Sequence, residues 1–473
     1  MLKVCKFGGS SLADAAQVSK VCDIVLADPN RRVVVVSAPG KRHKTDTKVT
    51  DLLITCGQQA LAGESYENTL AEIIGRYAEI QRELKLDPAL VDEISADLRA
   101  RLSLDRSHTG MFMDAMKAAG EDNSARLVAA ALQGRTDIPV RSAPANGQEC
   151  PFSLKAVYAS PAKTGMMLSD EFGNAQLLPE SYALLKKSLS ALLETNGVIV
   201  YPGFFGVTKS GHVATFPRGG SDITGSILAA ALEADVYENF TDVDSVYPVD
   251  PRLVPNVTHG IGEMTYREMR ELAYAGFGVF HDEAVLPAIR AGIAINIRNT
   301  NQPSAPGTWI RPKREPNPER PVVGIASDTG FVNVYIDKFL MNREVGFGLR
   351  LLKILAEENI PYEHMPSGID NVSLVLRERF FNEPTEERVM ERIKRELKPD
   401  NVQVDRGYAL LMIVGEGMQY TVGLTARATR ALAGAGVNIE MMNQGASEIS
   451  IMFGILEDDR AKAVQALYNE FFK

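Results

Sequence analysis

The chain has 473 residues, of which 45% are hydrophobic and 23% are charged, and its formal net charge is -9 at pH 7. That length exceeds what one hydrophobic core usually serves, so two or three globular domains are expected, and the composition excludes a disordered or fibrous protein. The negative charge argues against nucleic acid as a partner. No run approaches the roughly 20 apolar residues that span a bilayer, so a membrane is not expected as a partner either.

The cysteines and the N-terminus indicate a reducing compartment. The first residues, MLKVCKFGG, lead into a strand pattern rather than a signal peptide. No Cys-x-x-Cys pair occurs, so neither a disulfide framework nor a zinc site is expected from the four cysteines, Cys5, Cys22, Cys56 and Cys150. We therefore expect a cytoplasmic protein without a resident metal.

Short apolar runs alternate with helical patterns through the first part of the chain. Strands are predicted at residues 2–6 and 31–39 around a helix over 12–27, and later at 196–206, 211–216 and 294–300. Val33 to Val36 show no polar alternation, which is typical of a strand that helices cover on both faces. This order predicts a layered α/β domain. It ends near 303–321, where six prolines mark a boundary.

Beyond that boundary the sequence repeats itself. The stretch from Leu355 aligns without a gap on the stretch from Leu432, and identical residues recur at a constant offset of 77, among them Glu363 and Glu440. Each copy reads helix, strand, glycine-containing turn and strand, with a strand before it and a helix after it. The repeat therefore predicts two small split βαβ modules.

A glycine-rich turn opens an apolar helix at residues 216–235, FPRGGSDITGSILAAALEAD. The predicted N-cap is Ser221 or Asp222, and Gly219 and Gly220 allow the backbone to approach a ligand closely. The helix N-terminus and the fork of Arg218 would together form an anion site. A plain cap with a solvated arginine is the alternative for this stretch taken alone.

A second glycine-rich turn between a predicted strand and a predicted helix occurs near the N-terminus, in KFGGSSLADA. Lys6 ends a strand, and the next residues, Gly8, Gly9 and Ser10, can present backbone N–H groups to a phosphate. Neither a Walker A nor a Rossmann glycine pattern occurs in the chain. Two such turns suit an acceptor and a nucleotide bound across the carboxyl ends of a parallel sheet.

Six motifs in this order, KFGGSS, VVVVSAPG, FPRGGSD, FTDVDSVYPVDPR, ELAYAGFGVFH and IRNTNQPSAPGT, resemble the aspartokinase family of the amino-acid kinase fold. The resemblance implies an α/β fold, with a parallel-rich sheet sandwiched by helices, and two ferredoxin-like βαββαβ ACT modules. The expected domains are a catalytic domain at 1–310 and regulatory modules at 325–399 and 400–473. The sequence leaves open whether the two modules interleave.

The activity that the resemblance implies is ATP-dependent phosphorylation of the β-carboxylate of L-aspartate to 4-phospho-L-aspartate, with Mg²⁺. This is the first step of lysine, threonine and methionine biosynthesis, and inhibition by lysine, with or without threonine, is implied. A homo-oligomer, dimer or tetramer, through the ACT modules is implied as well. Two alternatives stay open: a catalytically inactive ACT-type amino-acid sensor, and another carboxylate kinase of the same fold.

The family's functional residues map onto this chain at matching motif positions. By resemblance Lys6 neutralises the transferring phosphoryl group, Asp222 orients the reacting groups and Arg218 clamps the substrate carboxylate. Three further residues resemble those that hold aspartate, with Glu121 pairing its ammonium group: Ser37, Thr50 and Glu121. The nucleotide-binding set implied is Lys6, Gly8, Gly9, Ser10, Gly219, Gly220, Ser221, Thr241, Asp242, Tyr247 and Arg252.

The first regulatory module carries the candidate effector site. Glu363 or Asp370 could receive the side-chain ammonium of lysine. These residues could equally serve the module's turns or its dimer packing. The candidates that the resemblance implies are Met341, Gly346, Phe347, Gly348, Leu349, Glu363, Ser367 and Asp370.

One position departs from the family. Gly278 stands where many aspartokinases carry a second phosphate-contacting lysine, and Arg252, Lys41 or Lys44 could replace that cation. His281 is interpreted as a packed residue at a helix start rather than a base. No base is required, because the attacking carboxylate is already ionised at neutral pH.

Overall fold

The computed structural model describes residues 1–473 except 137–154, 196, 218, 258, 278–281 and 446. Four residues singled out in the sequence, Cys150, Arg218, Gly278 and His281, therefore lie outside the described residues. The chain divides into two compact units: the first comprises 1–246, 262–266 and 281–314, and the second comprises 247–261, 267–280 and 315–473. The second unit thus includes two short segments from the middle of the chain.

The first unit is built on an eight-stranded sheet with the order β3-β4-β2-β1-β7-β9-β10-β8. Neighbouring strands are parallel except β9 and β10, so the expectation of a parallel-rich α/β sheet is confirmed. A separate hairpin joins β5 (Phe205–Val207) to β6 (Val213–Thr215). The sheet strands are β1 (Lys3–Phe7), β2 (Arg31–Val36), β3 (Ala156–Tyr158), β4 (Val198–Pro202), β7 (Val236–Thr241), β8 (Glu263–Thr265), β9 (Ala294–Asn299) and β10 (Thr308–Arg311).

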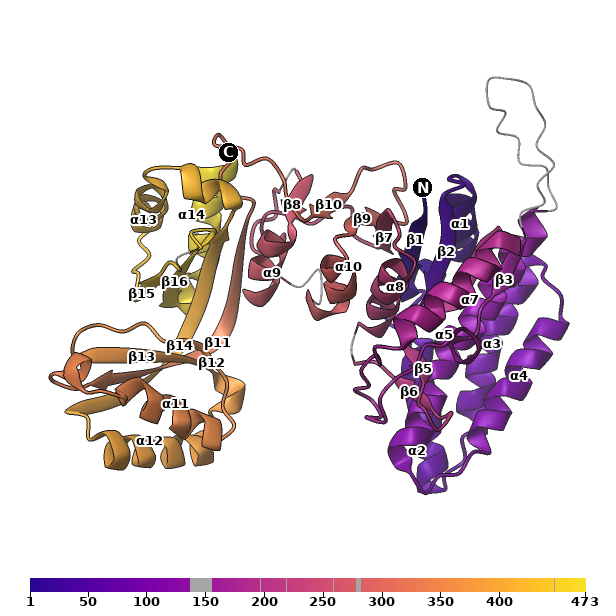
Figure 1. The fold of residues 1–473 in the computed structure, drawn as a ribbon, viewed down its shortest axis with the longest axis horizontal. Helices are drawn as coiled ribbons and strands as arrows, with labels where there is room; N and C mark the ends of the chain where they lie inside the picture. Colours follow the sequence, from indigo (N-terminus) through magenta and orange to yellow (C-terminus); the bar gives the residue numbers. More distant parts are fainter. Residues whose placement is uncertain (137–154, 196, 218, 258, 278–281, 446) are drawn as a thin grey trace. The chain divides into compact units, whose positions relative to one another are not determined.

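Helices cover both faces of this sheet (Figure 1). One face packs on α1 (Ala15–Leu26), α2 (Val49–Ala62), α3 (Glu67–Leu84), α4 (Ala89–Leu102) and α5 (Thr109–Thr136), and α7 (Ser181–Thr195) and α8 (Gly220–Ala231) cover the other, joined by the short helices α6 (Pro161–Thr164) and α10 (Leu286–Arg290). Val33 to Val36 are all fully buried, as their unbroken apolar run predicts. None of the helices in the described part of the chain is long and apolar enough to cross a membrane.

The central strand β1 separates two environments because successive side chains of a strand point to opposite faces. Cys5 and Phe7 enter the core beneath α1 to α5, and Lys6 points to the opposite face. On the core face, the buried carboxylate of Glu238 on β7 binds Arg31 at 2.6 Å and Arg298 at 3.0 Å. These ion pairs tie β2, β7 and β9 together beneath the sheet's centre.

The second unit contains a six-stranded antiparallel sheet with the order β12-β13-β11-β14-β16-β15. Its strands are β11 (Gly324–Asp337), β12 (Tyr362–His364), β13 (Asn371–Arg377), β14 (Asn401–Val414), β15 (Met441–Asn443) and β16 (Ser450–Leu456), and its helices are α9 (Tyr266–Tyr274), α11 (Phe347–Glu357), α12 (Glu383–Leu397), α13 (Leu424–Gly434) and α14 (Arg460–Phe472). The two repeat copies are two βαββαβ modules, as the offset of 77 predicts.

The two longest strands, β11 and β14, are each shared between the two modules. The end of β11, residues 331–337, pairs with β13 of the first module, whereas its beginning pairs with the end of β14, which in turn pairs with β16 of the second module. The beginning of β11 is therefore the fourth strand of the second module, although it precedes the whole first module in the chain. The interleaving that the sequence left open is present.

Glycines stand where each shared strand passes from one module to the other. Gly330 on β11 has φ +78° and Gly407 on β14 has φ +77°, and the register shifts between Asp328 and Phe331. Left-handed backbone of this kind suits glycine because it has no Cβ. The bulges let two long strands continue through both modules.

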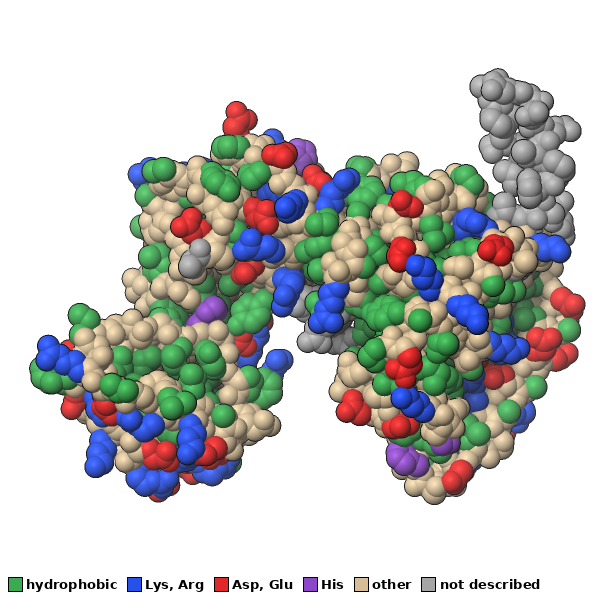
Figure 2. Space-filling view, in the orientation of Figure 1, with side chains coloured by type: hydrophobic (Ala, Val, Ile, Leu, Met, Phe, Trp, Pro, Cys, Tyr) green, Lys and Arg blue, Asp and Glu red, His purple; other side chains and the backbone are tan. Residues whose placement is uncertain are grey.

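Charged side chains gather over α12 on the face shown in Figure 2. Arg392 binds Glu396 on the same helix at 3.0 Å and Glu357 on α11 at 2.5 Å. Below this surface, Val389 and Ile393 are fully buried, so the four-residue spacing seen in the sequence marks the packed side of α12.

We predict that Glu238→Gln destabilises the first unit by about 3 to 5 kcal/mol, because it leaves Arg31 and Arg298 buried without their counter-charge. Urea unfolding at neutral pH measures the change. The matched control is Glu233→Gln, which removes the exposed pair with Lys186 and should cost less than about 1 kcal/mol. Equal effects of the two substitutions would show that the Glu238 network does not stabilise the sheet.

Candidate functional site

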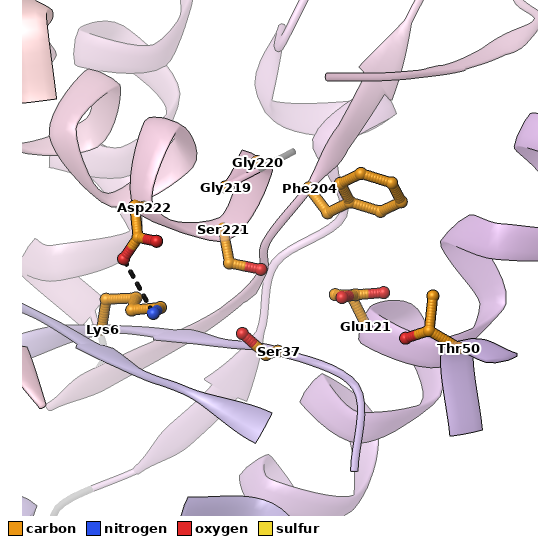
Figure 3. Close-up of a pocket in the computed structure, with 9 residues that line it drawn as sticks. All are labelled: Lys6, Ser37, Thr50, Glu121, Phe204, Gly219, Gly220, Ser221 and Asp222. Atoms are coloured by element: carbon orange, nitrogen blue, oxygen red, sulfur yellow. Dashed lines mark ion pairs between the residues drawn. The ribbon is translucent and has the colours of Figure 1, made fainter. Parts of the chain in front are cut away.

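A pocket of about 210 Å³ lies in the first unit where β1, β2 and β4 end and α8 begins (Figure 3). Ligands of open parallel sheets bind at this edge of the strands. Its lining is mostly polar, and it brings together eight of the residues that the sequence singled out. The lining residues are Lys6, Ser37, Thr50, Glu121, Phe204, Gly219, Gly220, Ser221 and Asp222.

Lys6 and Asp222 form an ion pair across the pocket, with 2.7 Å between Lys6 Nζ and Asp222 Oδ1 (Figure 3). The lysine side chain is only 10% exposed, and the aspartate side chain 24%. Asp222 stands in the first turn of α8 and Lys6 at the end of β1. A cation is therefore held at the place where the helix N-terminus favours negative charge.

The predicted N-cap of α8 was wrong. Gly219, with φ +85°, occupies the cap position, and it has no side chain with which to cap the helix. Because the left-handed glycine starts the helix earlier than a serine or aspartate cap would, Ser221 and Asp222 fall within its first turn. Their side chains face the pocket instead of closing off the backbone N–H groups.

Steric limits explain why positions 203 and 220 are occupied by glycine. A Cβ on Gly220 would lie 2.5 Å from the ring of Phe204, and a Cβ on Gly203 would lie 2.6 Å from Ser221 Oγ. Phe204 itself adopts φ +76°, which is uncommon for a bulky residue. Its N–H donates to Thr224 Oγ1 at 3.0 Å, which fixes the loop between β4 and β5 against α8. The sequence pattern placed Phe204 within the predicted strand 196–206 and gave it no role at the site.

Glu121 differs in its hydrogen bonding from Asp114 and Asp122, two other buried carboxylates of α5. Asp114 accepts the N–H groups of Gly173 and Thr215 at 2.7 and 2.8 Å, and Asp122 binds Arg101 at 2.6 Å. Glu121 is equally buried, yet its Oε2 has no hydrogen-bond partner among the described residues. Burial raises the pKa of Glu121 to about 8, and a hydrogen bond from the Ala38 backbone lowers it less. This carboxyl group is suited to receive a cation.

The side chain of Arg76 holds the loop between Ser37 and Thr50 in place. The buried Arg76 guanidinium donates to the carbonyls of Gly40 at 2.7 Å and Thr47 at 2.9 Å and pairs with Asp46 at 3.2 Å. Gly40 N–H donates to Gly9 O at 2.8 Å, so this loop also contacts the N-terminal glycine turn. Lys41 and Lys44 are exposed on the loop.

Several predicted nucleotide-binding residues do not line the pocket. Gly8 N–H donates to Phe240 O at 3.2 Å, and Gly9 and Ser10 form a short 3₁₀ turn after β1. Thr241 ends β7, where its hydroxyl accepts the Val243 N–H, and the next residue, Asp242, is exposed. The remaining two belong to the second unit, where Tyr247 is half-buried and Arg252 is 88% exposed and binds Asp250 at 2.7 Å.

The predicted effector residues fall into three groups in the first module of the second unit. Leu340 N–H donates to Asp370 Oδ1 at 2.8 Å and Asn342 N–H to Ile369 O at 3.1 Å, so the turn at Met341 lies beside the turn with Ser367 and Asp370. Gly346, with φ +79°, caps α11, in whose first turn Phe347 is buried and Leu349 is 74% exposed. Gly348 follows Phe347 in that turn. Glu363 is on β12, bound to Arg377 at 2.9 Å and to Tyr274.

Comparisons with known proteins agree with this architecture. The profile of the amino acid kinase family matches residues 1–299, and an ACT domain profile matches 411–471. The chain is 53% identical to aspartokinase 3 of Bacillus subtilis (strain 168) over 471 residues, which covers 100% of this chain and 99% of that one. The chain belongs to the aspartokinases.

Solved structures extend the likeness. The aspartate kinase of Clostridium acetobutylicum superposes with a TM-score of 0.81 at 34% identity, covering 99% of both chains. Aspartokinase III of E. coli, solved in complex with aspartate and ADP, superposes with a TM-score of 0.72 at 26% identity over 100% of both chains. The same E. coli enzyme in complex with lysine and aspartate gives 0.69. This aspartokinase is therefore an aspartate kinase with ACT modules.

The buried carboxyl group of Glu121 should give the ligand-free aspartokinase a distinctive pH dependence. Its pKa is raised from 4.5 to about 8 in the folded chain, so the folded chain holds a proton that the unfolded chain has released between those values. Stability therefore falls as the pH rises through this window and levels off above it. Replacement of Glu121 by glutamine, which does not titrate, removes this loss of stability.

We predict that the unfolding free energy of Glu121→Gln gains on the order of 3 kcal/mol over the unsubstituted chain between about pH 5.5 and 8. Urea unfolding without ligands at several pH values measures the difference. Glu171→Gln, at an exposed glutamate, should leave the two curves parallel. Parallel curves for Glu121→Gln as well would mean that Glu121 is ionised in the empty pocket.

Proposed function

We propose that this chain transfers the γ-phosphoryl group of ATP to the β-carboxylate of L-aspartate, which yields 4-phospho-L-aspartate and ADP. The observation that carries the proposal is the composition of the pocket: a buried carboxyl group, one of whose oxygens has no partner among the described residues, shares it with the Lys6–Asp222 pair and the N-terminus of α8. An amino acid with an ammonium group and an anionic acceptor matches this set. The aspartate and ADP bound by the E. coli relative support it.

In the proposed complex, Glu121 pairs with the ammonium group of aspartate, and Ser37 and Thr50 donate hydrogen bonds from their hydroxyls. Arg218, which precedes Gly219 in the chain, clamps the remaining carboxylate. Glu121 releases its proton when it gains this partner, because a nearby cation stabilises the ionised carboxylate. Thr241, Asp242, Tyr247 and Arg252 are proposed for the nucleotide.

The transfer itself needs no general base. An oxygen of the ionised β-carboxylate attacks the γ-phosphorus, a new oxygen–phosphorus bond forms, and the bond to the β,γ-bridging oxygen breaks, so its electron pair leaves with ADP. Lys6 and the amides of Gly219, Gly220 and Ser221 face the negative charge of the transferring group. Mg²⁺ enters as part of the substrate MgATP, since it is usually held by one or two carboxylates together with phosphates.

For regulation we propose that lysine, with or without threonine, inhibits the kinase by binding to the first ACT module. The lysine complex of the E. coli relative supports this assignment. Asp370 and Glu363 are the proposed partners of the lysine ammonium group, and Glu363 would have to share its present bond to Arg377. This inhibition would place the enzyme at the first step of lysine, threonine and methionine biosynthesis.

We also propose a homo-oligomer through the ACT modules. Large apolar side chains are exposed at the turns of the first module, including Val345 at 94%, Phe339 at 71% and Ile369 at 68%. Exposed apolar groups this close together favour burial against another protein surface. A second copy of the chain is the proposed partner.

ADP release with MgATP and aspartate tests the catalytic proposal, with glutamate as the comparison substrate. We expect turnover with aspartate only, and a loss of at least about 100-fold in kcat for Lys6→Met, because one cation facing the transferring charge is removed. Arg218→Ala should raise the KM for aspartate more than the KM for ATP. Lys20→Met, at an exposed lysine of α1, is the matched control. Turnover with glutamate but not aspartate would sink the proposal.

Lysine titrations of the same assay test the regulatory proposal. Asp370→Asn should raise the lysine concentration for half-inhibition by about tenfold or more, since a charge-assisted bond is lost, while kcat stays within about twofold. The matched control is Asp400→Asn: Asp400 also supports this loop, by accepting the Phe339 N–H at 2.6 Å, but it is not a proposed contact. Equal shifts for both variants would assign Asp370 to loop support instead. Threonine alone and with lysine completes the series.

A further inference from the structure

A second polar residue lies directly beside Lys6 on the pocket face of the sheet. Asn239 on β7 is the register partner of Lys6 on β1, so both side chains point to the same face from neighbouring strands roughly 5 Å apart. Asn239 is only 2% exposed. It thus lies beneath the first turn of α8, out of reach of solvent.

Asn239 and Lys6 share one acceptor. The distance from Asn239 Nδ2 to Asp222 Oδ1 is 2.6 Å, and Lys6 Nζ lies 2.7 Å from the same oxygen. A carboxylate can only accept, so the amide nitrogen of Asn239 must face it. The carbonyl oxygen of Asn239 is then buried without a hydrogen-bond partner in the described part of the chain. Packing alone does not account for an asparagine here, because an apolar residue would avoid this unmet acceptor.

The backbone of Asp222 is held independently of Asn239. Tyr237, two residues earlier on β7, donates its hydroxyl to Asp222 O at 3.2 Å. A Cβ on Gly225 would lie 2.6 Å from the Tyr237 ring, so α8 packs directly on that side chain. Tyr237 therefore sets the position of the helix turn, which leaves Asn239 to act on the Asp222 carboxylate.

We propose that Asn239 is a positioning residue for phosphoryl transfer, holding the Asp222 carboxylate in place when Lys6 turns from it to the transferring phosphoryl group. This inference rests on the proposed role of Lys6. Lys6 is bound to Asp222 in this structure, so it must exchange that bond for a phosphoryl oxygen. A neutral donor that stays on Oδ1 keeps the carboxylate oriented and hydrogen-bonded during the exchange, without adding a charge that competes for Lys6.

Two substitutions that preserve side-chain size separate this role from a structural one. Asn239→Leu removes the donor, so kcat should fall by about tenfold with the KM for aspartate within about twofold. Asn239→Asp places a second carboxylate beside Asp222 and holds Lys6 more tightly, so kcat should fall further, by about 100-fold. Asn239→Ala, which also lacks a side-chain donor, replaces the leucine variant if the latter does not fold.

The matched control is Asn296→Leu. Asn296 is an equally buried asparagine of the same sheet, whose Nδ2 donates to two backbone carbonyls, at 3.2 Å from Pro306 O and 3.4 Å from Thr308 O. It should lower thermal stability while the folded enzyme keeps its kcat. Asn239 variants with kcat within twofold of the unsubstituted enzyme, or with losses that match those of Asn296→Leu, would overturn the inference.

Amine labelling of Lys6, read by mass spectrometry, needs no turnover. In the ligand-free protein Asn239→Asp should slow the labelling of Lys6 severalfold and leave that of Lys20 unchanged, because only Lys6 gains a second carboxylate neighbour. Unchanged labelling of Lys6 would count against the inference. Absence of aspartate-dependent turnover in the unsubstituted chain would instead refute the proposed function, so the two failures are distinguishable.

Discussion

The parallel pairing of β1 with β7 is the constraint on which the site depends. Its register sets Lys6 beside Asn239 and Cys5 beside Glu238, and the two-residue period of a strand sends these pairs to opposite faces. One face buries an ion network under α1 to α5, and the other presents a lysine to the first turn of α8. A slip by one residue would exchange the two faces and bury Lys6 in the core.

Two buried carboxylates, Glu238 in the core and Glu121 at the pocket, have opposite surroundings. Glu238 is surrounded by Arg31, Arg298 and Lys3. Burial opposes its ionisation, but the hydrogen bond and charge of Arg31 and the charge of Lys3 keep its pKa below the usual value. Glu121 lies as deep but has an oxygen without a partner, so burial dominates and its pKa rises. A fully paired buried carboxylate belongs to the scaffold, whereas an unpaired one at a pocket is prepared for a ligand.

In the second unit, the shared strands β11 and β14 join the two modules into one continuous sheet. Because β11 and β14 run through both modules, a shift at one module cannot leave the other unchanged without breaking the ladder between them. Residues 267–280 join this unit although they lie in the sequence between segments of the first unit. The Tyr274 hydroxyl donates to Glu363 of β12, so a segment from the middle of the chain contacts a proposed effector residue directly.

The sequence by itself determined the α/β class, the two glycine turns and the repeat at an offset of 77, because periodicity and turn chemistry are local properties. The family resemblance added Ser37, Thr50 and Glu121, which line the same pocket. Only the tertiary structure decided that Gly219 rather than Ser221 or Asp222 begins α8, that Phe204 and Asn239 belong to the site, and that β11 serves both modules. These features depend on strand register and on contacts between residues far apart in the chain, which a local pattern does not encode.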